Sequence, residues 1–452
     1  MKKDNVTILG GGLCGSLLSI ILAERGMKVT LLERRADPRA DDGEAGRSIN
    51  LVMSARGIRA LKYAGVFEKV EPLLMPMQGR LIHDVDGKTE NHPYGQDDSE
   101  VIYSVSRAEL NRKLIDCADS SHNVTIRFQH ESVSYYPEEA TLRVRDHAKG
   151  SDYDLKARPL IAADGAGSRV RRAFNNTDTL SGTEDLLGHS YKELAIPSGP
   201  NGEFQLSPDA LHIWPRGGYM LIALPNPGGD FTLTLFFPAE GDPSFASLNS
   251  DQKVTDFFNE QFADAVPLID DLIGSWNRNP VGILGTVRCK HWHEAGNLLL
   301  IGDAAHAVVP FHGQGMNLAF EDCIILDQVL DNPNADWEKV FKVYETEQIA
   351  NANAIADMAL ENYIEMRDTV RDPKYLLRRE LSFALERRLP KRFIPRYSMI
   401  MFHDEIPYSV AQERGLAQQK LLERLTEGVD SIDEIDIDEA VKVVESRLPP
   451  VH

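Results

Sequence analysis

The chain has 452 residues, of which 42% are hydrophobic and 26% charged, a composition typical of a globular protein with two or three domains. Its formal net charge of −20 argues against nucleic acid or an anionic membrane surface as a partner, because both attract basic patches. Four widely spaced cysteines argue against a disulfide framework or a zinc site. The absence of a long apolar run argues against a membrane anchor, so a cytoplasmic protein is expected.

A glycine-rich βαβ unit opens the chain. A strand is expected over Val6–Leu9, a helix over Gly15–Arg25, and a second strand over Lys28–Leu32, which leads to Glu33. The turn after the first strand has the spacing G-x-G-x-x-G, with glycines at Gly10, Gly12 and Gly15. Such glycines make a tight turn, let the backbone approach a pyrophosphate and let the helix pack on the strand, while an acidic residue accepts a ribose hydroxyl. The unit predicts a dinucleotide-binding fold, with NAD, NADP and FAD all open as cofactors.

A short hairpin is expected further along the chain. A strand over Arg80–Val85 leads into Asp86-Gly87, a common hairpin turn, and Tyr94 lies on the returning limb. Because Arg80 and Tyr94 flank the turn at nearly equal distances, a hairpin brings them close together. A guanidinium is well shaped for a bidentate contact with a carboxylate, and a tyrosine hydroxyl can add a hydrogen bond. A solvated arginine and a packed tyrosine are the structural alternative.

Two further pairs of aspartate and glycine follow apolar strands. Asp164-Gly165 is the first pair, and Gly302-Asp303 follows a buried-type strand over Asn297–Ile301; either alone is compatible with a plain turn. The second pair leads to a glycine-rich helix start at residues 313–317, whose backbone N–H groups can face an anion or a polar ring edge. Three such sites with a single G-x-G-x-x-G indicate one extended dinucleotide, which favours FAD.

The texture of the sequence changes twice and suggests the domain organisation. Residues 190–238 are rich in strand patterns, and the chain is largely helical from Trp337 onward, with a break at Pro390–Pro395. The expected fold class is α/β with an α+β substrate part. Its parts are a Rossmann-like cofactor-binding domain (1–77, 98–176 and 286–335), an interleaved antiparallel-sheet substrate domain (78–97 and 177–285) and a C-terminal helical region (336–452).

One helical face in the C-terminal region carries a polar residue among apolar ones. Asn362 shares this face with Ile355, Met358, Ala359 and Met366 by their spacing. If Asn362 is buried it needs a partner, and a ligand and a structural hydrogen bond are both open. Glu365 lies beside the face and can brace Asn362 or Tyr397. Pocket walls are also expected from aromatic residues, with ordinary core packing as the alternative: Phe236, Phe237, Phe311 and His312.

The ordered motifs resemble the FAD-dependent aromatic hydroxylases, which are single-component flavoprotein monooxygenases. The resemblance rests on the glycine-rich turn with Glu33, on Asp164-Gly165, and on Gly302-Asp303-Ala-Ala-His306. It implies that FAD is bound, with Glu33 on the ribose and Asp303 on the ribityl or pyrophosphate portion. The implied FAD contacts are Gly10, Gly12, Leu13, Cys14, Gly15, Glu33, Arg34, Arg35, Arg107, Asp164, Asp303, Gly315, Met316 and Asn317.

Further segments, at residues 46–51, 103–107, 211–216, 310–317 and 362–367, resemble the family members that hydroxylate L-kynurenine next to its aromatic amine. By this resemblance Arg80 and Tyr94 hold the substrate carboxylate, and Asn362 and Tyr397 complete the contacts. Further candidates for substrate contacts, taken from the helical face and the aromatic walls, are Glu365, Met366, Phe237, Phe311 and His312. Eukaryotic members carry a C-terminal membrane anchor, whereas this chain ends in acidic sequence, so a bacterial-type member without an anchor is expected.

The implied activity is hydroxylation of L-kynurenine to 3-hydroxykynurenine with O₂ and NADPH through a flavin C4a-hydroperoxide, with no catalytic side chain and no metal. Preference for NADPH over NADH stays open, and so does the oligomeric state, for which a homodimer is one possibility. The alternatives are a related flavin hydroxylase acting on another aromatic acid and a non-catalytic relative of the FAD-binding fold.

Overall fold

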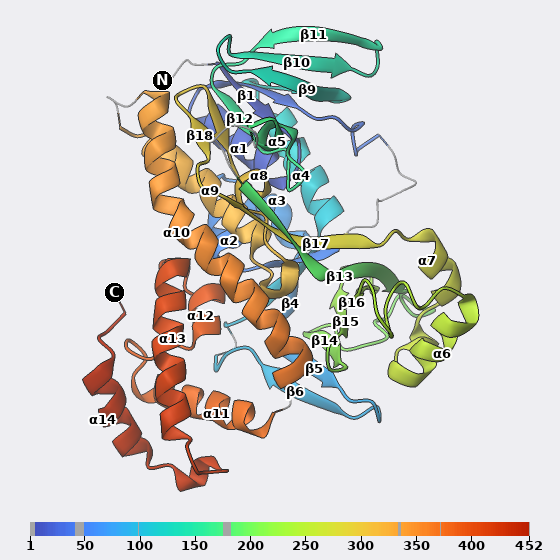
Figure 1. The fold of residues 1–452 in the computed structure, drawn as a ribbon, viewed down its shortest axis with the longest axis vertical. Helices are drawn as coiled ribbons and strands as arrows, with labels where there is room; N and C mark the ends of the chain where they lie inside the picture. The colour runs from blue at the N-terminus through green and yellow to red at the C-terminus, as the bar shows by residue number, and fades with distance from the viewer. Residues whose placement is uncertain are drawn as a thin grey trace. The chain divides into compact units, whose positions relative to one another are not determined.

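The N-terminal βαβ unit forms as the sequence predicts (Figure 1). It consists of β1 (Asn5–Leu9), α1 (Leu13–Glu24) and β2 (Lys28–Leu32). The computed structural model describes residues 5–40, 49–97, 99–174, 182–332, 336–370 and 372–451. The motif at residues 46–51 therefore lies partly outside the described residues.

The chain forms two units, each built from three separate segments. The first contains residues 1–75, 103–188 and 281–356, and the second contains residues 76–102, 189–280 and 357–452. Some elements run from one unit into the other along the chain: β4 (Met75–Met77), β7 (Ile102–Ser106), β13 (Gly182–Ile196) and α10 (Trp337–Ile364). The domain boundaries expected from the sequence stay a prediction.

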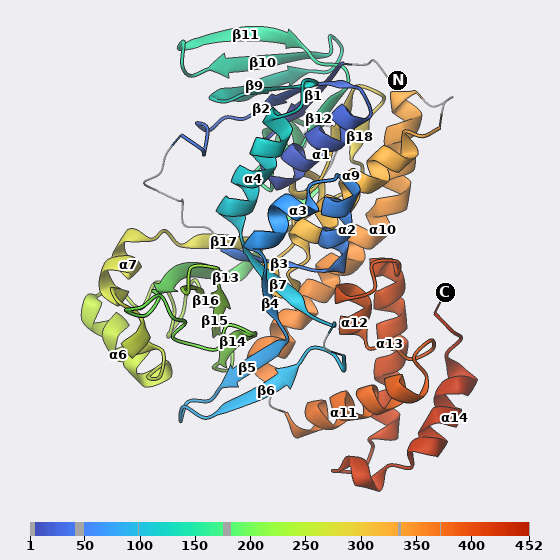
Figure 2. The same ribbon diagram turned by 180° about the vertical axis from the view of Figure 1, so that it is seen from behind.

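The first unit is built on a largely parallel sheet in the order β18-β19-β12-β1-β2-β8. Its strands are short apolar runs, buried over most of their length, as parallel strands covered on both faces usually are. Helix α1 packs against β2 and against two other helices of this unit, α4 and α9 (Figure 2). The elements that follow β2 are β3 (Asn50–Met53), α2 (Ala55–Tyr63), α3 (Phe67–Val70), η1 (Glu71–Leu73), α4 (Arg107–Asp119), β8 (Val124–Arg127), β9 (His130–Tyr136), β10 (Thr141–Asp146), β11 (Ser151–Lys156), β12 (Leu160–Ala162), α5 (Arg169–Phe174), β17 (Gly282–Cys289), β18 (His293–Glu294), β19 (Leu298–Leu300), α8 (Asp303–His306), η3 (Pro310–His312) and α9 (Gly315–Val329).

The second unit is built on a sheet that runs β13-β16-β15-β14-β5-β6 through this part of the chain. Neighbouring strands are antiparallel except β14 and β5, which are parallel, so the antiparallel pattern expected from the sequence has one interruption. Its elements are β5 (Gly79–His83), β6 (Thr89–Pro93), β14 (Ala210–Pro215), β15 (Met220–Pro225), β16 (Phe231–Pro238), α6 (Asp251–Gln261), η2 (Val266–Leu268), α7 (Leu272–Arg278), the π-helical turn η4 (Glu365–Thr369), α11 (Pro373–Arg388), α12 (Arg396–Met401), α13 (Tyr408–Leu425), η5 (Ile432–Glu434) and α14 (Ile437–Arg447).

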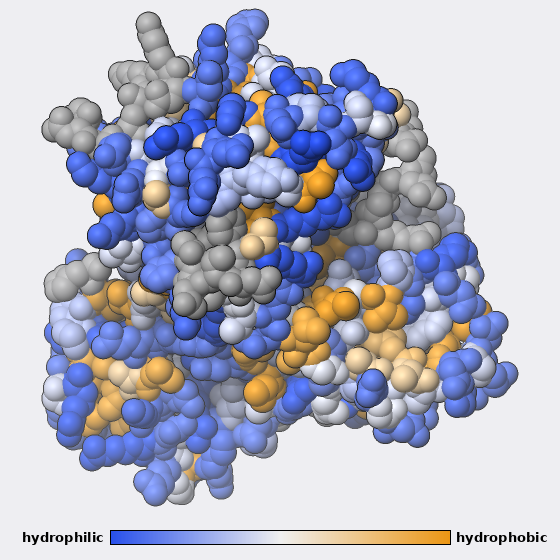
Figure 3. All heavy atoms as spheres, turned by 45° about the horizontal axis from the view of Figure 1, so that its top comes forward, coloured by the Kyte–Doolittle hydropathy of each residue, from blue (hydrophilic) through white to orange (hydrophobic). Residues whose placement is uncertain are grey.

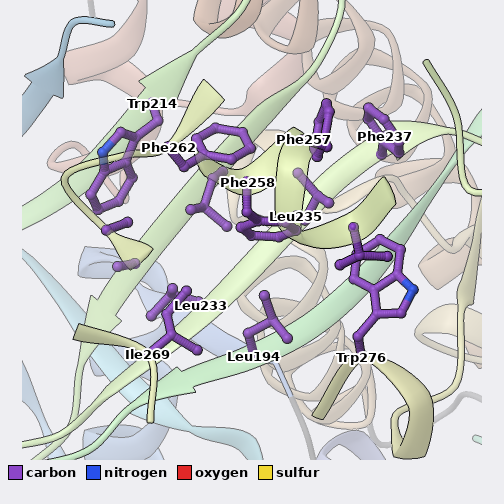
Figure 4. Packing of buried hydrophobic residues seen from close by; sticks show 14 of the residues in the cluster. Leu194, Trp214, Leu233, Leu235, Phe237, Phe257, Phe258, Phe262, Ile269 and Trp276 are labelled. Carbon is purple, nitrogen blue, oxygen red and sulfur yellow. The ribbon is translucent and has the colours of Figure 1, made fainter. Parts of the chain in front are cut away.

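The core of the second unit lies between this sheet and helices α6 and α7 (Figure 4). Alternate residues of β16 point into it, because successive side chains of a strand face opposite sides. They are Phe231, Leu233, Leu235 and Phe237, which pack with Trp214, Phe258 and Trp276. Phe236, which lies between two of them in the strand, is therefore on the other face of the sheet.

The C-terminal helices form a second, smaller core. Leu381 and Leu385 of α11 pack with Ala440 and Val444 of α14. Asp372 begins α11 by accepting hydrogen bonds from the backbone N–H groups of Lys374 and Tyr375, and Pro373 occupies the first turn, where its missing N–H does no harm. Hydrophilic residues cover most of the face seen in Figure 3. Within the described part of the chain, no helix combines the length and the apolar character needed to cross a membrane.

Candidate functional site

The three glycine-rich turns lie at one edge of the first unit's sheet. β19, β12, β1 and β2 are adjacent and parallel, and their last residues are in register: Leu300 with Ala162, Ala162 with Leu9, and Leu9 with Leu32. The turns that follow these strands therefore emerge together at the carboxyl edge. This is the edge at which open α/β sheets bind their ligands. The prediction that the turns share one extended ligand is consistent with this arrangement.

The first turn requires glycine at two of its positions, Gly10 and Gly15. Gly10 has a φ of +97°, and a side chain there would collide with the backbone carbonyl of Ala163. A side chain at Gly15 would collide with the carbonyl of Gly10, which would separate α1 from the strand. Gly12 differs, because a Cβ there would meet no protein atom within 4 Å. Gly12 is also the N-cap of α1, and it has no side chain that could bond the first backbone N–H groups of the helix. Open space therefore lies in front of the helix N-terminus.

Glu33 is buried beside this turn at the end of β2. Its Oε2 accepts a hydrogen bond of 2.8 Å from the backbone N–H of Gly11, and its Oε1 accepts 2.9 Å bonds from the backbone N–H and Nε of Arg35. Burial alone would raise the pKa of Glu33, but the bonds from Arg35 and Gly11 lower it below its usual range. Glu33 is therefore an ionised acceptor. Arg34 and Arg35 are exposed next to it.

The second turn presents the carboxylate of Asp164, which can accept a further hydrogen bond. Asp164 Oδ2 accepts a 3.1 Å hydrogen bond from the backbone N–H of Arg169. Its Oδ1 is buried and has no hydrogen-bond partner among the described residues. Burial raises the pKa of Asp164 above its usual value. The fully buried Arg171 links this turn to the third one, because its guanidinium donates to the carbonyl of Ala166 and, over 2.8 Å, to the carbonyl of Ala304.

The third turn is fixed by a buried pair of side chains, Asp322 and His306. Asp322 accepts a 3.2 Å hydrogen bond from the backbone N–H of Gly302 and a 2.7 Å contact from His306 Nε2. Burial would lower the pKa of His306, but Asp322 raises it above its usual value. The contact with Asp322 thus favours the protonated form of His306 and gives this residue a structural role. Asp303 is partly buried at the start of α8.

The start of α9 is fixed by Asn317. This residue is completely buried, its Oδ1 accepts a 3.0 Å bond from the backbone N–H of Ser54, and its Nδ2 donates 2.8 Å bonds to the carbonyls of Val52 and Gly313. The side chain of Asn317 is thus used by the protein, so any contact with a cofactor falls to the backbone of this turn. Gly315 is partly exposed and Met316 is buried.

Three other residues assigned to the cofactor lie at helix starts. Leu13 and Cys14 are partly exposed at the beginning of α1, and Arg107 is exposed at the beginning of α4. The Sγ atoms of Cys14 and Cys323 are 3.8 Å apart. This contact and burial raise the pKa of the Cys14 thiol well above its usual value, which makes a reactive thiolate unfavourable.

The edge as a whole fits a bound dinucleotide. The open helix N-terminus at Gly12 suits a pyrophosphate, the ionised Glu33 suits a ribose diol, and the spare oxygen of Asp164 suits a hydroxyl donor. These three features come from different strands, as an extended ligand requires.

A second candidate site, in the second unit, is centred on the buried Arg80 of β5. The hairpin forms as predicted, with Arg80 opposite His92, so Tyr94 follows directly after β6. The guanidinium lies 5.7 Å from the ring centre of Tyr94 and 5.0 Å from that of Tyr397. The two tyrosine rings stack with centroids 5.3 Å apart. The cation and the phenol of the hairpin are therefore joined by a second phenol, Tyr397, from a distant part of the chain.

Glu365 is the only carboxylate with a described ion pair to Arg80. Its Oε1 lies 3.4 Å from Arg80 Nη1 and accepts a 2.7 Å hydrogen bond from the hydroxyl of Tyr375. Arg80 Nε is buried and has no hydrogen-bond partner among the described residues. Burial alone would lower the pKa of Arg80, but the surrounding phenols and Glu365 raise it above its usual range. The site thus holds a permanent cation with donor capacity to spare.

The apolar helical face around Asn362 is buried as predicted. Asn362 is 5% exposed, and its Nδ2 lies 3.3 Å from the sulfur of Met366. The helix changes to a π-helical turn at Glu365, a geometry often found at functional sites. Glu365 contacts Arg80 and Tyr375, and its expected bracing of Asn362 or Tyr397 stays a prediction.

The aromatic wall residues fall into different environments. Phe237 is fully buried in the core under α6 and α7, so its assignment to the substrate is corrected to core packing. Phe236, on the opposite face of β16, is the better candidate for a wall. Phe311 and His312 are buried in η3 of the first unit, and their roles stay predictions.

Helix α11 contributes contacts that the sequence did not indicate. Tyr375 binds Glu365, Arg379 donates to the carbonyl of Pro93, and Glu386 Oε2 accepts a 2.5 Å bond from the side chain of Gln96. The last two of these contacts, to Pro93 and Gln96, lie on either side of Tyr94 along the chain. Neither hydrophobic periodicity nor a motif marks them, because they are single polar residues on an amphipathic helix.

Replacing Glu386 with glutamine should change how stability depends on pH. Burial raises the pKa of Glu386 to about 7. In the unfolded chain a glutamate titrates near pH ~4.3. Between these values the folded chain retains a proton that the unfolded chain has released, so stability falls as pH rises. We expect Glu386→Gln to reduce this fall, measured by urea unfolding at about pH 5 and pH 8. The control is Glu380→Gln, an exposed position of the same helix; equal pH dependence in the parent and Glu386→Gln would contradict the assignment.

Comparisons with known proteins agree with this architecture. A family model described as an FAD binding domain matches residues 3–193 and 281–359. The chain is 45% identical over 449 residues to the kynurenine 3-monooxygenase of Myxococcus xanthus, covering 99% of this chain and 96% of the relative. It is 46% identical over 445 residues to the kynurenine 3-monooxygenase of Stenotrophomonas maltophilia, covering 98% of this chain and 97% of the relative.

Solved structures share the fold at lower sequence identity. The tetrameric form of 2-methyl-3-hydroxypyridine-5-carboxylic acid oxygenase superimposes with a TM-score of 0.66 at 20% identity, covering 83% of this chain and 96% of that one. PqsL of Pseudomonas aeruginosa, a probable FAD-dependent monooxygenase solved in complex with 2-aminobenzoylacetate, gives a TM-score of 0.64 at 21% identity, covering 81% of this chain and 97% of that one. The fold, the FAD binding domain and the full-length identity to these relatives together show that the chain is a flavoprotein monooxygenase of the kynurenine 3-monooxygenase family.

Proposed function

We propose that the protein hydroxylates L-kynurenine at ring carbon 3, with FAD as the bound cofactor and NADPH as the reductant. One oxygen atom of O₂ enters the ring and the other leaves as water, while NADPH is oxidised to NADP⁺ and one proton is taken up from solution. The observation that carries the proposal is the buried guanidinium of Arg80, which lies 5.7 and 5.0 Å from the ring centres of the stacked Tyr94 and Tyr397, with Glu365 beside it. The relatives named kynurenine 3-monooxygenase, at 45% and 46% identity, support the choice of substrate.

The charges of this site suit an amino acid. Arg80 offers a cation to the α-carboxylate, with the unused Nε available for a second hydrogen bond. Glu365 offers a carboxylate to the α-ammonium group, from a position already within 3.4 Å of Arg80. A simple aromatic acid has no ammonium group, so it would share Arg80 with Glu365 and bring no second cation to it. This pairing favours an amino acid over the phenolic acids that related hydroxylases use.

Other residues of the second unit orient the substrate. In this proposal the hydroxyls of Tyr94 and Tyr397 add hydrogen bonds to the carboxylate. Asn362, which is buried, adds a further polar contact to the substrate. Met366 and Phe236 supply apolar contact to the ring. Holding a reactant in one orientation can contribute several orders of magnitude in rate, and no side chain needs to donate or accept a proton.

The carboxyl edge of the first unit holds FAD in this proposal. The turn at Gly10–Gly15, with Leu13 and Cys14, binds the pyrophosphate at the helix N-terminus, and Glu33 binds the ribose. Asp164 and Asp303 bind further hydroxyl or phosphate groups, and the backbone of Gly315, Met316 and Asn317 lies against the flavin ring, with Arg107 also in contact. FAD, when bound, supplies the redox chemistry and the activation of O₂, and the protein positions the substrate and excludes water.

The test is NADPH oxidation by the purified, FAD-loaded protein with and without L-kynurenine. We expect L-kynurenine to stimulate oxidation and to yield a product one oxygen heavier. Stimulation by a phenolic acid in place of L-kynurenine would instead select a related flavin hydroxylase. A protein that binds no FAD would contradict the flavoenzyme assignment altogether. NADH, run in parallel, decides the reductant.

A further inference from the structure

A chain of three hydrogen bonds crosses the helix-covered side of the second unit's sheet. His83 Nδ1 lies 2.8 Å from Asp264 Oδ2, His83 Nε2 lies 2.8 Å from His212 Nδ1, and His212 Nε2 lies 2.8 Å from the carbonyl oxygen of Ser207. His83 is 4% exposed and His212 is 1% exposed. The chain joins the end of β5, the middle of β14 and the loop after α6. We call Asp264, His83, His212 and Ser207 the histidine relay.

The relay needs one more proton than two neutral imidazoles carry. Each of its hydrogen bonds requires one hydrogen, so three are needed. Both ends, a carboxylate and a backbone carbonyl, are acceptors and supply none. A neutral histidine carries one N–H, so His83 and His212 together supply only two. Without a third proton, one contact of 2.8 Å would set two lone pairs against each other.

The surroundings place the additional charge on His83. Burial lowers the pKa of His212 to about 4, so His212 stays neutral. Trp214 Nε1 donates to both oxygens of Asp264, over 3.0 and 2.9 Å. Burial raises the pKa of Asp264, but the bonds from His83 and Trp214 lower it below its usual range, so Asp264 stays ionised. The ring of Trp214 also stacks on His83 with centroids 4.0 Å apart, which stabilises a cation.

Two other charged groups face the relay. Asp209, in the loop before β14, lies near enough to act on His212. Arg216 donates a 3.0 Å hydrogen bond to the backbone carbonyl of His83 and a 2.6 Å bond to the carbonyl of Gln261 at the end of α6. Arg216 therefore fastens the same two elements through their backbones, β5 and α6, that the relay joins through side chains.

The relay also bears on Arg80. His83 and Arg80 are three residues apart in β5, so their side chains point to opposite faces of the sheet. The relay fixes β5 from the helix-covered face, and the guanidinium of Arg80 lies on the other face. We propose that the histidine relay retains an additional proton on His83 at neutral pH and that it positions the strand that presents Arg80 to the substrate carboxylate.

Histidine ¹⁵N spectra of the FAD-loaded protein test the retained proton without reference to activity. At about pH 8 an ordinary histidine is mostly neutral. We expect the spectrum of the parent to contain a histidine ring with both nitrogens protonated. Its absence from the spectrum of His83→Phe assigns this ring to His83. A second such ring is expected at His306. Asp264→Asn should also lose the signal, because an asparagine amide can donate to His83 Nδ1 and satisfy the relay with His83 neutral. The control is Asp256→Asn, which removes a charge from the exposed side of α6. A neutral His83 in the parent at this pH would overturn the proposal.

The positioning role is tested by kinetics and rests on the proposed function. With L-kynurenine we expect KM of the parent to rise several-fold as alkaline pH removes the proton, with kcat changed less than twofold. Asp264→Asn should keep its KM flat over the same range, because its relay needs no additional proton. His83→Phe should have a raised KM at every pH. The same alkaline rise in Asp264→Asn as in the parent would overturn the positioning role. A parent that shows the doubly protonated ring but no activity with L-kynurenine would contradict the proposed function alone.

Discussion

Arg80→Ala is expected to raise KM for L-kynurenine by roughly 30-fold to 1000-fold, the largest effect of a single substitution in the second unit. The substitution removes a buried cation that would be paired with the substrate carboxylate, and truncating one partner of such a pair costs about 2–4 kcal/mol. Each 1.4 kcal/mol corresponds to about a factor of ten. Since the carboxylate contact is the same in the ground state and the transition state, kcat should fall less than KM rises.

Two comparisons isolate the carboxylate contact. The decarboxylated analogue of L-kynurenine has no partner for Arg80, so its KM should differ little between the parent and Arg80→Ala. Lys88→Ala, an exposed cation on the turn of the same hairpin, should leave both KM values unchanged. Equal effects of Arg80→Ala on the two compounds would show that Arg80 acts on the structure of the site and not on the carboxylate.

Gly12→Ala is expected to weaken FAD binding at least about tenfold while leaving the apoprotein stable. A methyl group at this position meets no protein atom within 4 Å, and the backbone has a φ of −75°, which alanine adopts readily. The methyl group would occupy the space in front of α1 that the proposal gives to the pyrophosphate. A loss of about 1.4 kcal/mol or more in binding free energy is expected for a contact of this kind. FAD titration followed by flavin fluorescence measures it.

Gly15→Ala serves as the contrasting variant. Its methyl group would collide with the carbonyl of Gly10, so it should lower the stability of the apoprotein as well as FAD affinity. Gly188→Ala, where a Cβ also meets open space but at an exposed position of β13, should change neither. FAD affinity that is unchanged in Gly12→Ala would contradict the placement of the pyrophosphate in this turn.

The elements that the sequence predicted well are those whose signal is local. The turn at Gly10–Gly15 combines glycine spacing with a strand before it and a helix after it, and the hairpin around Asp86-Gly87 has a turn signal between two strand patterns. Local patterns also placed Asn362 on a buried face. In each case the residues that determine the structure lie within about one element of each other in the chain.

The remaining features depend on contacts between distant segments. The approach of Glu365 and Tyr375 to Arg80 joins residues 285 positions or more apart, and no local pattern specifies it. Phe236 and Phe237 are adjacent and equally aromatic, so only the placement of α6 and α7 decides which one enters the core. No sequence pattern predicts the histidine relay, for the same reason: Asp264, His83 and His212 come from separate elements and fit no motif.

Hydroxylation itself is tested by running the reaction under isotopically heavy O₂ and analysing the product by mass spectrometry. We expect the FAD-loaded protein, given NADPH and L-kynurenine, to form 3-hydroxykynurenine carrying one heavy oxygen atom, in amounts close to the NADPH consumed. NADPH consumption that yields hydrogen peroxide and leaves L-kynurenine unchanged would contradict it.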